Sequence, residues 1–242
     1  MCVHYAKSPQ LTFDFIQFTK RDKLRRLDPN LHPEFSAPAD FPEDTYPKSM
    51  APLIIEEGGT QRLVMMHWGV LTQFAGTGKP FVKPVHNART DKFSSFTWRS
   101  SVAERRCLIP ATGFYEAGPG PEGARGKVFF TLPDRPVFFF AGIWDRHRIG
   151  EGRGFAMVTT EPNVITRPFH DRMPVILTDD EAMEWIGDQP LPPDQVAELC
   201  RSQSSDALQT KVFAAKPKDE RPPKLTVKRP SKEPPPEQPT LF

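Results

Sequence analysis

The 242-residue chain has few cysteines, no long apolar stretch and almost no net charge. Its three cysteines show no paired spacing, which excludes a disulfide framework and suits a reducing compartment. Because no apolar run reaches about 18 residues and no basic-then-apolar leader is present, we expect no membrane span and no signal peptide. The net charge of +2 does not indicate nucleic acid, so any anion-binding site must be local. From these absences we expect a cytoplasmic protein.

Proline, in contrast, is abundant: the 28 prolines are more than twice the usual share of about 5%. Residues 216–242 alone hold eight prolines, seven lysines or arginines and four acids. Proline removes backbone donors, and so little apolar surface cannot offset the entropy lost on ordering. We therefore predict one domain over residues 1–215, followed by a disordered, mildly basic segment over residues 216–242, here called the C-terminal tail.

The rest of the chain indicates a mixed α and β domain. Short β-type runs bounded by glycine, proline or charge occupy residues 62–68, 106–116, 127–132, 136–144, 155–160 and 173–177, with a hairpin loop over 118–126. Helices are expected over 11–19, over 178–186 with a Thr178–Glu181 capping box, and over 191–202, while residues 28–60 are expected to be irregular. Because few helices separate the strands, we predict an α+β fold: a compact, antiparallel, barrel-like β domain with flanking helices.

Cys2 follows the initiator methionine directly. Methionine aminopeptidases remove Met before small residues, and the product here is a 1,2-aminothiol, which no internal residue can supply. An α-amine has a pKa of about 7.7–8.0, against about 10.4 for lysine, so it is far more often a free nucleophile near pH 7. Such an amine condenses with an aldehyde to a Schiff base, which the thiol closes to a thiazolidine. The alternative is that a cysteine stands here by chance.

Four motifs follow one another along the chain: Met-Cys at the start, HNAR (86–89), RRCLIPATGFYEA (105–117) and HDRMPVIL (170–177). Together they resemble the SOS response-associated peptidase (SRAP) family, the abasic-site processing proteins. The resemblance implies the SRAP fold and a covalent, reversible thiazolidine crosslink between Cys2 and the ring-opened sugar of an abasic site in single-stranded DNA. The crosslink would shield the site from strand cleavage, and neither a cofactor nor a metal is implied.

The resemblance also implies catalytic roles. Asn87 would orient the sugar or the N-terminal cysteine, Glu116 would be the catalytic acid, and His170 a second acid/base that also assists reversal. Glu and His have the intermediate pKa values that proton transfer needs. The family's self-processing implies removal of Met1 by attack of the Cys2 thiol, hence hydrolase (protease) and lyase activities, although an external aminopeptidase would serve equally. The structural alternatives are a turn cap for Asn87, an exposed strand edge for Glu116 and a surface ion-pair cluster around His170.

DNA contacts are expected from Arg89 and Arg172, because guanidinium pairs with phosphate in a bidentate way. Trp68 matches the family's Trp-Gly pair, whose ring can stack on an unpaired base, and core packing is the alternative. The chain departs from the family pattern at His4, where the family has an arginine on a DNA phosphate, and at Ala117, where the family has tryptophan. Residues 203–215 match the strand that closes the family fold only poorly.

The chain ends in QPTLF, which resembles the pentapeptide that binds the bacterial sliding clamp. Leu241 and Phe242 would fill an apolar pocket while Gln238 anchors through its amide, and a flexible proline-rich tether permits this docking. A fortuitous ending is the alternative.

We therefore expect a monomeric bacterial protein, cytoplasmic and associated with the nucleoid when bound to DNA. One alternative is a cysteine peptidase that acts on other proteins through Cys2, Glu116 and His170. Another is a non-catalytic single-stranded-DNA adaptor docked on the clamp. A Cys2/His4/His170 zinc site is not expected, since the spacing matches no common site. Cys107 and Cys200 lie in apolar surroundings and are expected to be buried structural thiols.

Overall fold

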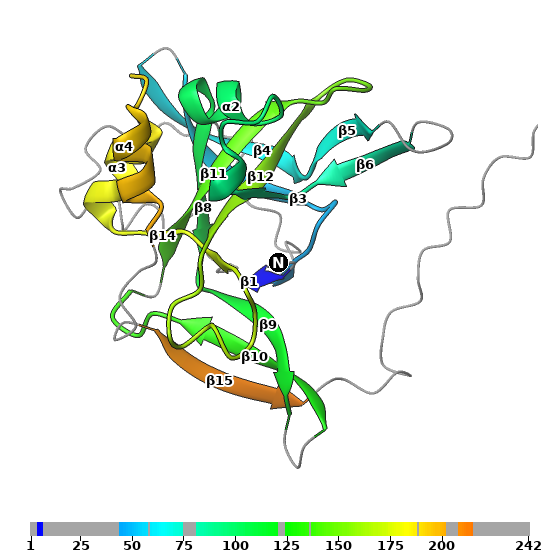
Figure 1. The fold of residues 1–242 in the computed structure, drawn as a ribbon, viewed down its shortest axis with the longest axis vertical. Helices are drawn as coiled ribbons and strands as arrows, with labels where there is room; N and C mark the ends of the chain where they lie inside the picture. Colours follow the sequence, from blue (N-terminus) through cyan, green and yellow to red (C-terminus); the bar gives the residue numbers. More distant parts are fainter. Residues whose placement is uncertain are drawn as a thin grey trace, which may run out of the picture.

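The computed structural model describes residues 4–6, 44–57, 59–74, 81–120, 124–135, 137–187, 189–201 and 208–214 (Figure 1). These residues form a closed sheet, a five-stranded sheet, a two-stranded arm and short helices. The helix expected over residues 11–19 and the C-terminal tail lie outside the described residues.

The closed sheet is a barrel of five strands. Its strands are β3 (Met50–Glu57), β4 (Thr60–Trp68), β8 (Arg106–Ala111), β11 (Phe138–Arg146) and β12 (Arg153–Thr160). They run in the order β12-β4-β3-β8-β11, and β11 pairs with β12, which closes the ring. The β12–β4 pair is parallel and the other pairs of the ring are antiparallel. Closure leaves no unpaired edge within the ring.

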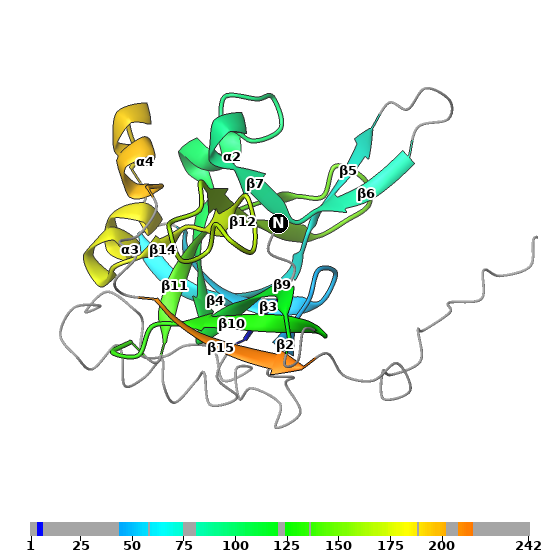
Figure 2. The same cartoon turned by 60° about the horizontal axis from the view of Figure 1, so that its bottom comes forward.

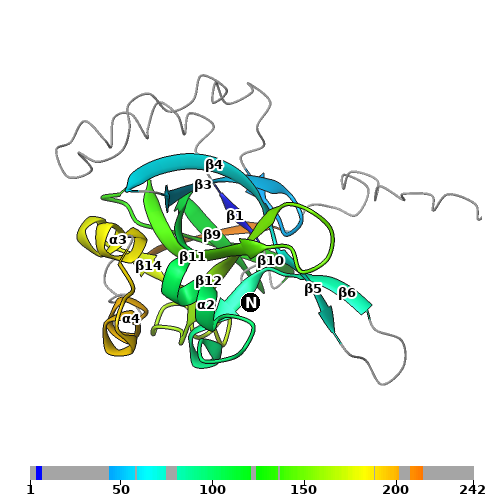
Figure 3. The same ribbon diagram turned by 90° about the horizontal axis from the view of Figure 1, so that it is seen from above.

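Three short strands attach to this barrel: β7 (Asn87–Arg89) and β13 (Met173–Pro174) pair with β12, and β14 (Ile176–Leu177) pairs with β11. The arm consists of β5 (Val70–Phe74) and β6 (Phe81–Val85). It projects away from the barrel on the side opposite the helices, as Figures 2 and 3 show.

The five-stranded sheet packs against one end of the barrel, with β15 at its edge (Figure 1). Its order is β15 (Gln209–Ala214), β10 (Arg125–Thr131), β9 (Gly113–Pro119), β1 (Tyr5–Ala6) and β2 (Asp44–Thr45). Successive residues of a strand face opposite sides of a sheet. Phe114 and Phe130 accordingly lie on the inner face and are fully buried, whereas Tyr115 and Phe129 lie on the outer face.

The helices cover the barrel on one side (Figure 3). They are α2 (Arg99–Glu104), α3 (Asp179–Ile186) and α4 (Pro193–Leu199), with a 3₁₀ turn, η2, at Thr90–Lys92. The predicted capping box is present at α3, where Thr178 and Glu181 bond each other's backbone N–H groups. Within the described residues, no helix combines the length and the apolar character needed to span a membrane.

The core falls into two clusters, one between barrel and helices and one between barrel and sheet. Trp185 anchors the first, and its indole N–H donates to the carbonyls of Cys107 and Gly142, both at 3.1 Å. Phe114, Phe130 and Phe140 dominate the second. Cys107 and Cys200 are buried, as expected.

The α+β, barrel-like fold is confirmed, with corrections in detail. The run 106–116 is two strands, because the chain leaves the barrel at Thr112 and enters the second sheet, where the Thr112 amide bonds the Ala6 carbonyl. The run 173–177 is likewise divided at Val175, whose two flanking strands join different partners. The expectation of irregular structure over 28–60 is wrong for β2 and β3. The poor match over 203–215 does not prevent β15 from pairing along its whole length with β10.

Candidate functional site

Asn87 begins β7, and the carbonyl of the preceding residue, His86, accepts hydrogen bonds from two sides. Met157 on β12 donates its amide to the His86 carbonyl at 3.0 Å, and the Trp68 indole N–H donates to the same oxygen at 2.7 Å. These two bonds fix the residue that precedes Asn87. The Asn87 side chain is buried, with 7% of the residue exposed.

Glu116 lies on the inner face of β9, opposite Val128 on β10. Its Oε1 atom is buried and accepts no hydrogen bond from the described residues. Burial raises the pKa of this carboxyl to about 7, the positive charge of the chain's amino terminus acts to lower it, and the nearby Asp171 charge raises it. A carboxyl with such a pKa exists in both protonation states at neutral pH, which suits general acid/base work.

His170 lies in the loop that joins β12 to β13, and this loop rests on the second sheet. The Asn163 Oδ1 atom accepts the amides of Ile165 and Thr166, at 3.1 and 2.9 Å, and so fixes the turn. Phe169 packs against Phe130 and Gly118, where a Cβ would meet the Phe169 ring at 3.1 Å. Because Gly118 is two residues from Glu116 on the same face of β9, the loop brings His170 and Glu116 to one region.

Two contacts of His170 meet at its Nδ1 atom. Its Nδ1 atom accepts the Arg172 amide at 3.0 Å and lies 2.7 Å from the Asp171 carboxylate. The first contact requires an unprotonated Nδ1 and the second a protonated one. Burial and the charge of the amino terminus lower the pKa of His170, while Asp171 raises it. The pKa of His170 thus lies below its ordinary value, mainly because the ring is partly buried.

Cys2 lies outside the described residues, and His4 is the first residue that the structure describes. The Tyr115 amide donates to the His4 carbonyl at 3.0 Å, one residue from Glu116. Cys2 is two positions before His4 in the sequence, and two residues of chain span at most about 7 Å. The positive charge of the amino terminus acts to lower the pKa values of His86, Glu116 and His170, which lie next to or within the predicted site.

The two arginines predicted to bind phosphate differ in exposure. Arg172 is only 2% exposed and is held by Glu161 at 2.8 Å, by Thr90 at 3.1 Å and by the Thr159 carbonyl. These contacts make it a structural link between the His170 loop, β12 and η2. Arg89 is exposed and forms two hydrogen bonds with Asp91, at 2.9 and 3.0 Å. A phosphate can reach Arg89 directly, whereas Arg172 is enclosed.

Trp68 and His4 are both buried. The Trp68 ring is fully enclosed by neighbours that include Tyr5 and Phe155, which favours core packing over stacking on a base. His4 is 5% exposed and lies between the rings of Tyr46 and Tyr115, with centroid distances of 4.3 and 4.0 Å. The arginine that the family pattern has at this place is thus replaced by an enclosed ring.

Asp171 acts on both Glu116 and His170, a role that no sequence signal revealed beyond its place beside His170. Lys127 was also missed: its Nζ atom lies 3.2 Å from the His4 Nδ1 atom, because strand pairing joins segments more than 100 residues apart. Among the described residues, no His, Cys, Asp and Glu side chains gather in a group that could hold a metal ion.

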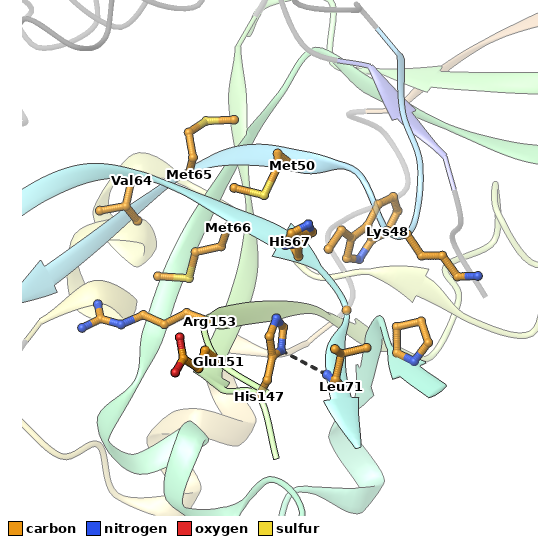
Figure 4. A pocket seen from close by; sticks show the side chains of 14 residues that line it. Lys48, Met50, Val64, Met65, Met66, His67, Leu71, His147, Glu151 and Arg153 are labelled. Carbon is orange, nitrogen blue, oxygen red and sulfur yellow. Dashed lines mark hydrogen bonds between the residues drawn. The ribbon is translucent and has the colours of Figure 1, made fainter. Parts of the chain in front are cut away.

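A cavity of about 810 Å³ opens beside the ends of β4 and β12 (Figure 4). Met50, Met65, Met66 and His67 line it from β3 and β4, and His147 and Arg153 lie across from them. The predicted catalytic residues Asn87, Glu116 and His170 are not part of its wall, whereas Trp68 is.

Comparison with known proteins agrees with these observations. The family model described as "SOS response associated peptidase (SRAP)" matches residues 1–215. The abasic site processing protein YoqW of Bacillus subtilis is 31% identical over 176 residues, which cover 70% of this chain and 78% of that protein. The abasic site processing protein YoaM of Bacillus subtilis is 30% identical over 187 residues, which cover 73% of this chain and 82% of that protein.

Solved structures share the fold. A protein of Bacteroides thetaiotaomicron superposes with a TM-score of 0.66 at 20% identity, covering 87% of this chain and 91% of that one. A protein of Bordetella bronchiseptica gives 0.66 at 23% identity, covering 88% and 100%. With the family model matching most of its length, the chain belongs to the SOS response-associated peptidase (SRAP) family.

Proposed function

We propose that this protein recognises abasic sites in single-stranded DNA and crosslinks itself to them reversibly through Cys2 once Met1 has been removed. The observation that carries the proposal is Glu116, a buried carboxyl with a pKa of about 7 that stands one residue from the backbone partner of His4. The relatives named as abasic site processing proteins support this class of substrate.

The reaction needs protons to move in both directions at one place. The Cys2 amine adds to the aldehyde carbon of the open sugar, and loss of one water gives a Schiff base. The Cys2 sulfur then adds to the same carbon, its proton passes to the nitrogen, and the thiazolidine ring is closed. Glu116 takes a proton from the amine and returns one to the departing hydroxyl, for which a pKa near 7 is suited.

His170 and Asn87 complete the site. His170, whose pKa burial lowers, is the second acid/base, and it donates a proton to the sugar oxygen as the sugar ring opens. In reversal the same group takes the proton back. Asn87 orients the sugar or the cysteine through its amide. The closed thiazolidine has no iminium to promote β-elimination, so the DNA strand stays intact.

We propose that the same groups remove Met1. The Cys2 thiol attacks the Met1 carbonyl, the acyl group passes from nitrogen to sulfur, and water hydrolyses the thioester to free methionine and the Cys2 amine. An external aminopeptidase is the alternative. Intact mass measurement of protein made in a cell-free system without aminopeptidase separates the two, because only self-processing yields a chain without Met1, and Glu116→Gln then retains it.

The test of crosslinking is a denaturing gel with single-stranded DNA that carries one abasic site. Wild type should give a slow band that survives denaturation, Cys2→Ala should give none, and Glu116→Gln should form it about 10²–10⁴ times more slowly, the usual contribution of a general acid/base. No band from wild type with a free Cys2 amine contradicts the proposal and favours the adaptor or the peptidase acting on other proteins.

We propose in addition that the protein docks on the sliding clamp as a monomer, at the bacterial nucleoid, through Gln238, Leu241 and Phe242. These residues lie outside the described structure, and the support is the QPTLF sequence. Clamp binding measured by surface plasmon resonance should disappear in a Leu241→Ala/Phe242→Ala double variant. Equal binding by the double variant and wild type contradicts this part of the proposal.

A further inference from the structure

The outer face of the five-stranded sheet carries aromatic rings and cations in alternation. Strand register places Tyr115 opposite Phe129 and Phe129 opposite Lys211, while Lys127 lies opposite Phe213. Directly opposed residues share one face of a sheet. Tyr46 joins them from the segment after β2, and Arg125 lies on the same side of β10. We call this surface the cation–aromatic face: Tyr46, Tyr115, Arg125, Lys127, Phe129, Lys211 and Phe213.

Contacts within the face set cations against rings. The Lys127 ammonium lies 5.6 Å from the Tyr115 ring centroid and 5.8 Å from that of Tyr46, and the Lys211 ammonium lies 5.2 Å from that of Phe213. Tyr46 and Phe213 are 45% and 38% exposed, and the three cationic side chains are exposed as well. Large aromatic rings rarely stay this open on a sheet unless a partner uses them.

The charge of the face is positive. Arg125, Lys127 and Lys211 are exposed on it, and the Asp44 carboxylate lies 2.9 Å from the His4 Nε2 atom. Burial lowers the pKa of His4, Asp44 acts to raise it, and Lys127 acts to lower it. His4 is therefore neutral near pH 7, and Lys127 supplies the positive charge beside the amino-terminal strand.

A surface on which aromatic rings alternate with cations best fits single-stranded nucleic acid. The phosphates of such a strand pair with cations, and its bases stack on aromatic rings. Lys127 and Lys211 are diagonal neighbours on adjacent strands, about 7–8 Å apart at the backbone, so both ammonium groups can contact one strand. His4 links this face to the reaction site, since its side chain lies between Tyr46 and Tyr115 and Cys2 precedes it by two residues.

We propose that the cation–aromatic face binds the single-stranded DNA that flanks the abasic site, with Lys127 and Lys211 on phosphates and the exposed rings under bases. This inference rests on the proposed function, and it extends the DNA contact to the side of β9 opposite Glu116. DNA held here keeps the reacting sugar near Cys2 before any covalent bond forms.

The test uses the full chain and undamaged single-stranded DNA, whose binding needs no crosslinking. Affinity is measured by fluorescence anisotropy over a range of salt for wild type and for Lys127→Gln/Lys211→Gln. The slope of log affinity against log salt should become shallower by about 1.4, since each phosphate contact on a single strand contributes about 0.7. Lys127→Arg/Lys211→Arg should restore the slope, and Arg62→Gln/Arg146→Gln, which removes two exposed charges from the barrel, should leave it unchanged.

Thermal unfolding first confirms that each variant is folded. The assignment of this face is wrong if the glutamine variant has the same salt slope as wild type, or if the barrel control loses as much slope as the glutamine variant. It is also wrong if wild type does not bind undamaged DNA. Crosslinking to a short abasic oligonucleotide with one nucleotide on each side should be the same in wild type and the glutamine variant. Failure of crosslinking in wild type refutes the proposed function separately from the salt slope.

Discussion

Replacing Glu116 with glutamine is expected to stabilise the protein at neutral and alkaline pH while it slows crosslinking. The carboxyl is 7% exposed, its Oε1 atom accepts no hydrogen bond from the described residues, and its pKa rises from 4.5 to about 7 because of burial. Above pH 7 the folded protein therefore holds a buried carboxylate whose burial cost is only partly offset by the charge of the amino terminus, and glutamine removes that carboxylate charge while it keeps the shape of the side chain.

The sign and size follow from proton linkage. Between pH 4.5 and about 7 the folded state keeps a proton that the unfolded state has released, so the free energy of unfolding falls as the pH rises through this window. The rise in pKa corresponds to about 3 kcal/mol, since each pKa unit is worth about 1.4 kcal/mol. The stability gained in Glu116→Gln should thus grow from near zero below pH 4.5 to about 3 kcal/mol above pH 7.

Urea unfolding of wild type and Glu116→Gln, at pH values below 4.5, within the window and above 7, measures the difference. Glu151→Gln, at an exposed loop position, is the matched control and should show no such growth with pH. A stability difference between Glu116→Gln and wild type that does not change with pH would refute the argument that burial holds the proton on Glu116.

Three further predictions concern the packing around the site. Gly118→Ala should slow crosslinking and cost about 1–3 kcal/mol in urea unfolding, because the new Cβ meets Val128 at 2.7 Å and the Phe169 ring at 3.1 Å and displaces the His170 loop; an unchanged crosslinking rate contradicts this. Thr178→Ala should lose about 1 kcal/mol of stability with crosslinking unaffected, since it removes only the capping box of α3. In a Cys2→Ala background, a thiol reagent should react with Cys107 and Cys200 only after the protein unfolds. Burial raises the pKa of both thiols, that of Cys200 to about 12, so rapid reaction of the native protein would contradict this prediction.

The sequence predicted those helices and strands that are determined by residues close together in the chain. The Thr178–Glu181 capping box lies within one turn, and the sequence alone located α3. The strand runs were found because their apolar residues are contiguous. Sequence could not show where a run changes partners, as at Thr112 and Val175, because the break comes from which strands lie alongside and not from the residues themselves.

The electrostatics of the candidate site could not be predicted from the sequence. The family motifs named Glu116 and His170, whereas the elevated pKa of Glu116 depends on burial and on Asp171 across the loop. The burial of Trp68 and Arg172 depends on contacts with segments far away in the chain, so their enclosure could not be read from their own motifs. The cation–aromatic face is likewise assembled by register between strands distant in sequence.

The most direct test of the central claim is mass spectrometry of the product formed with a short single-stranded DNA that carries one abasic site. The product should be a chain that lacks Met1 and has gained the mass of the DNA less one water, with the adduct on Cys2 in the digested peptide. An adduct on a lysine, or an unmodified Cys2 whose amine is free, would contradict the claim that the aminothiol of Cys2 is the reacting group.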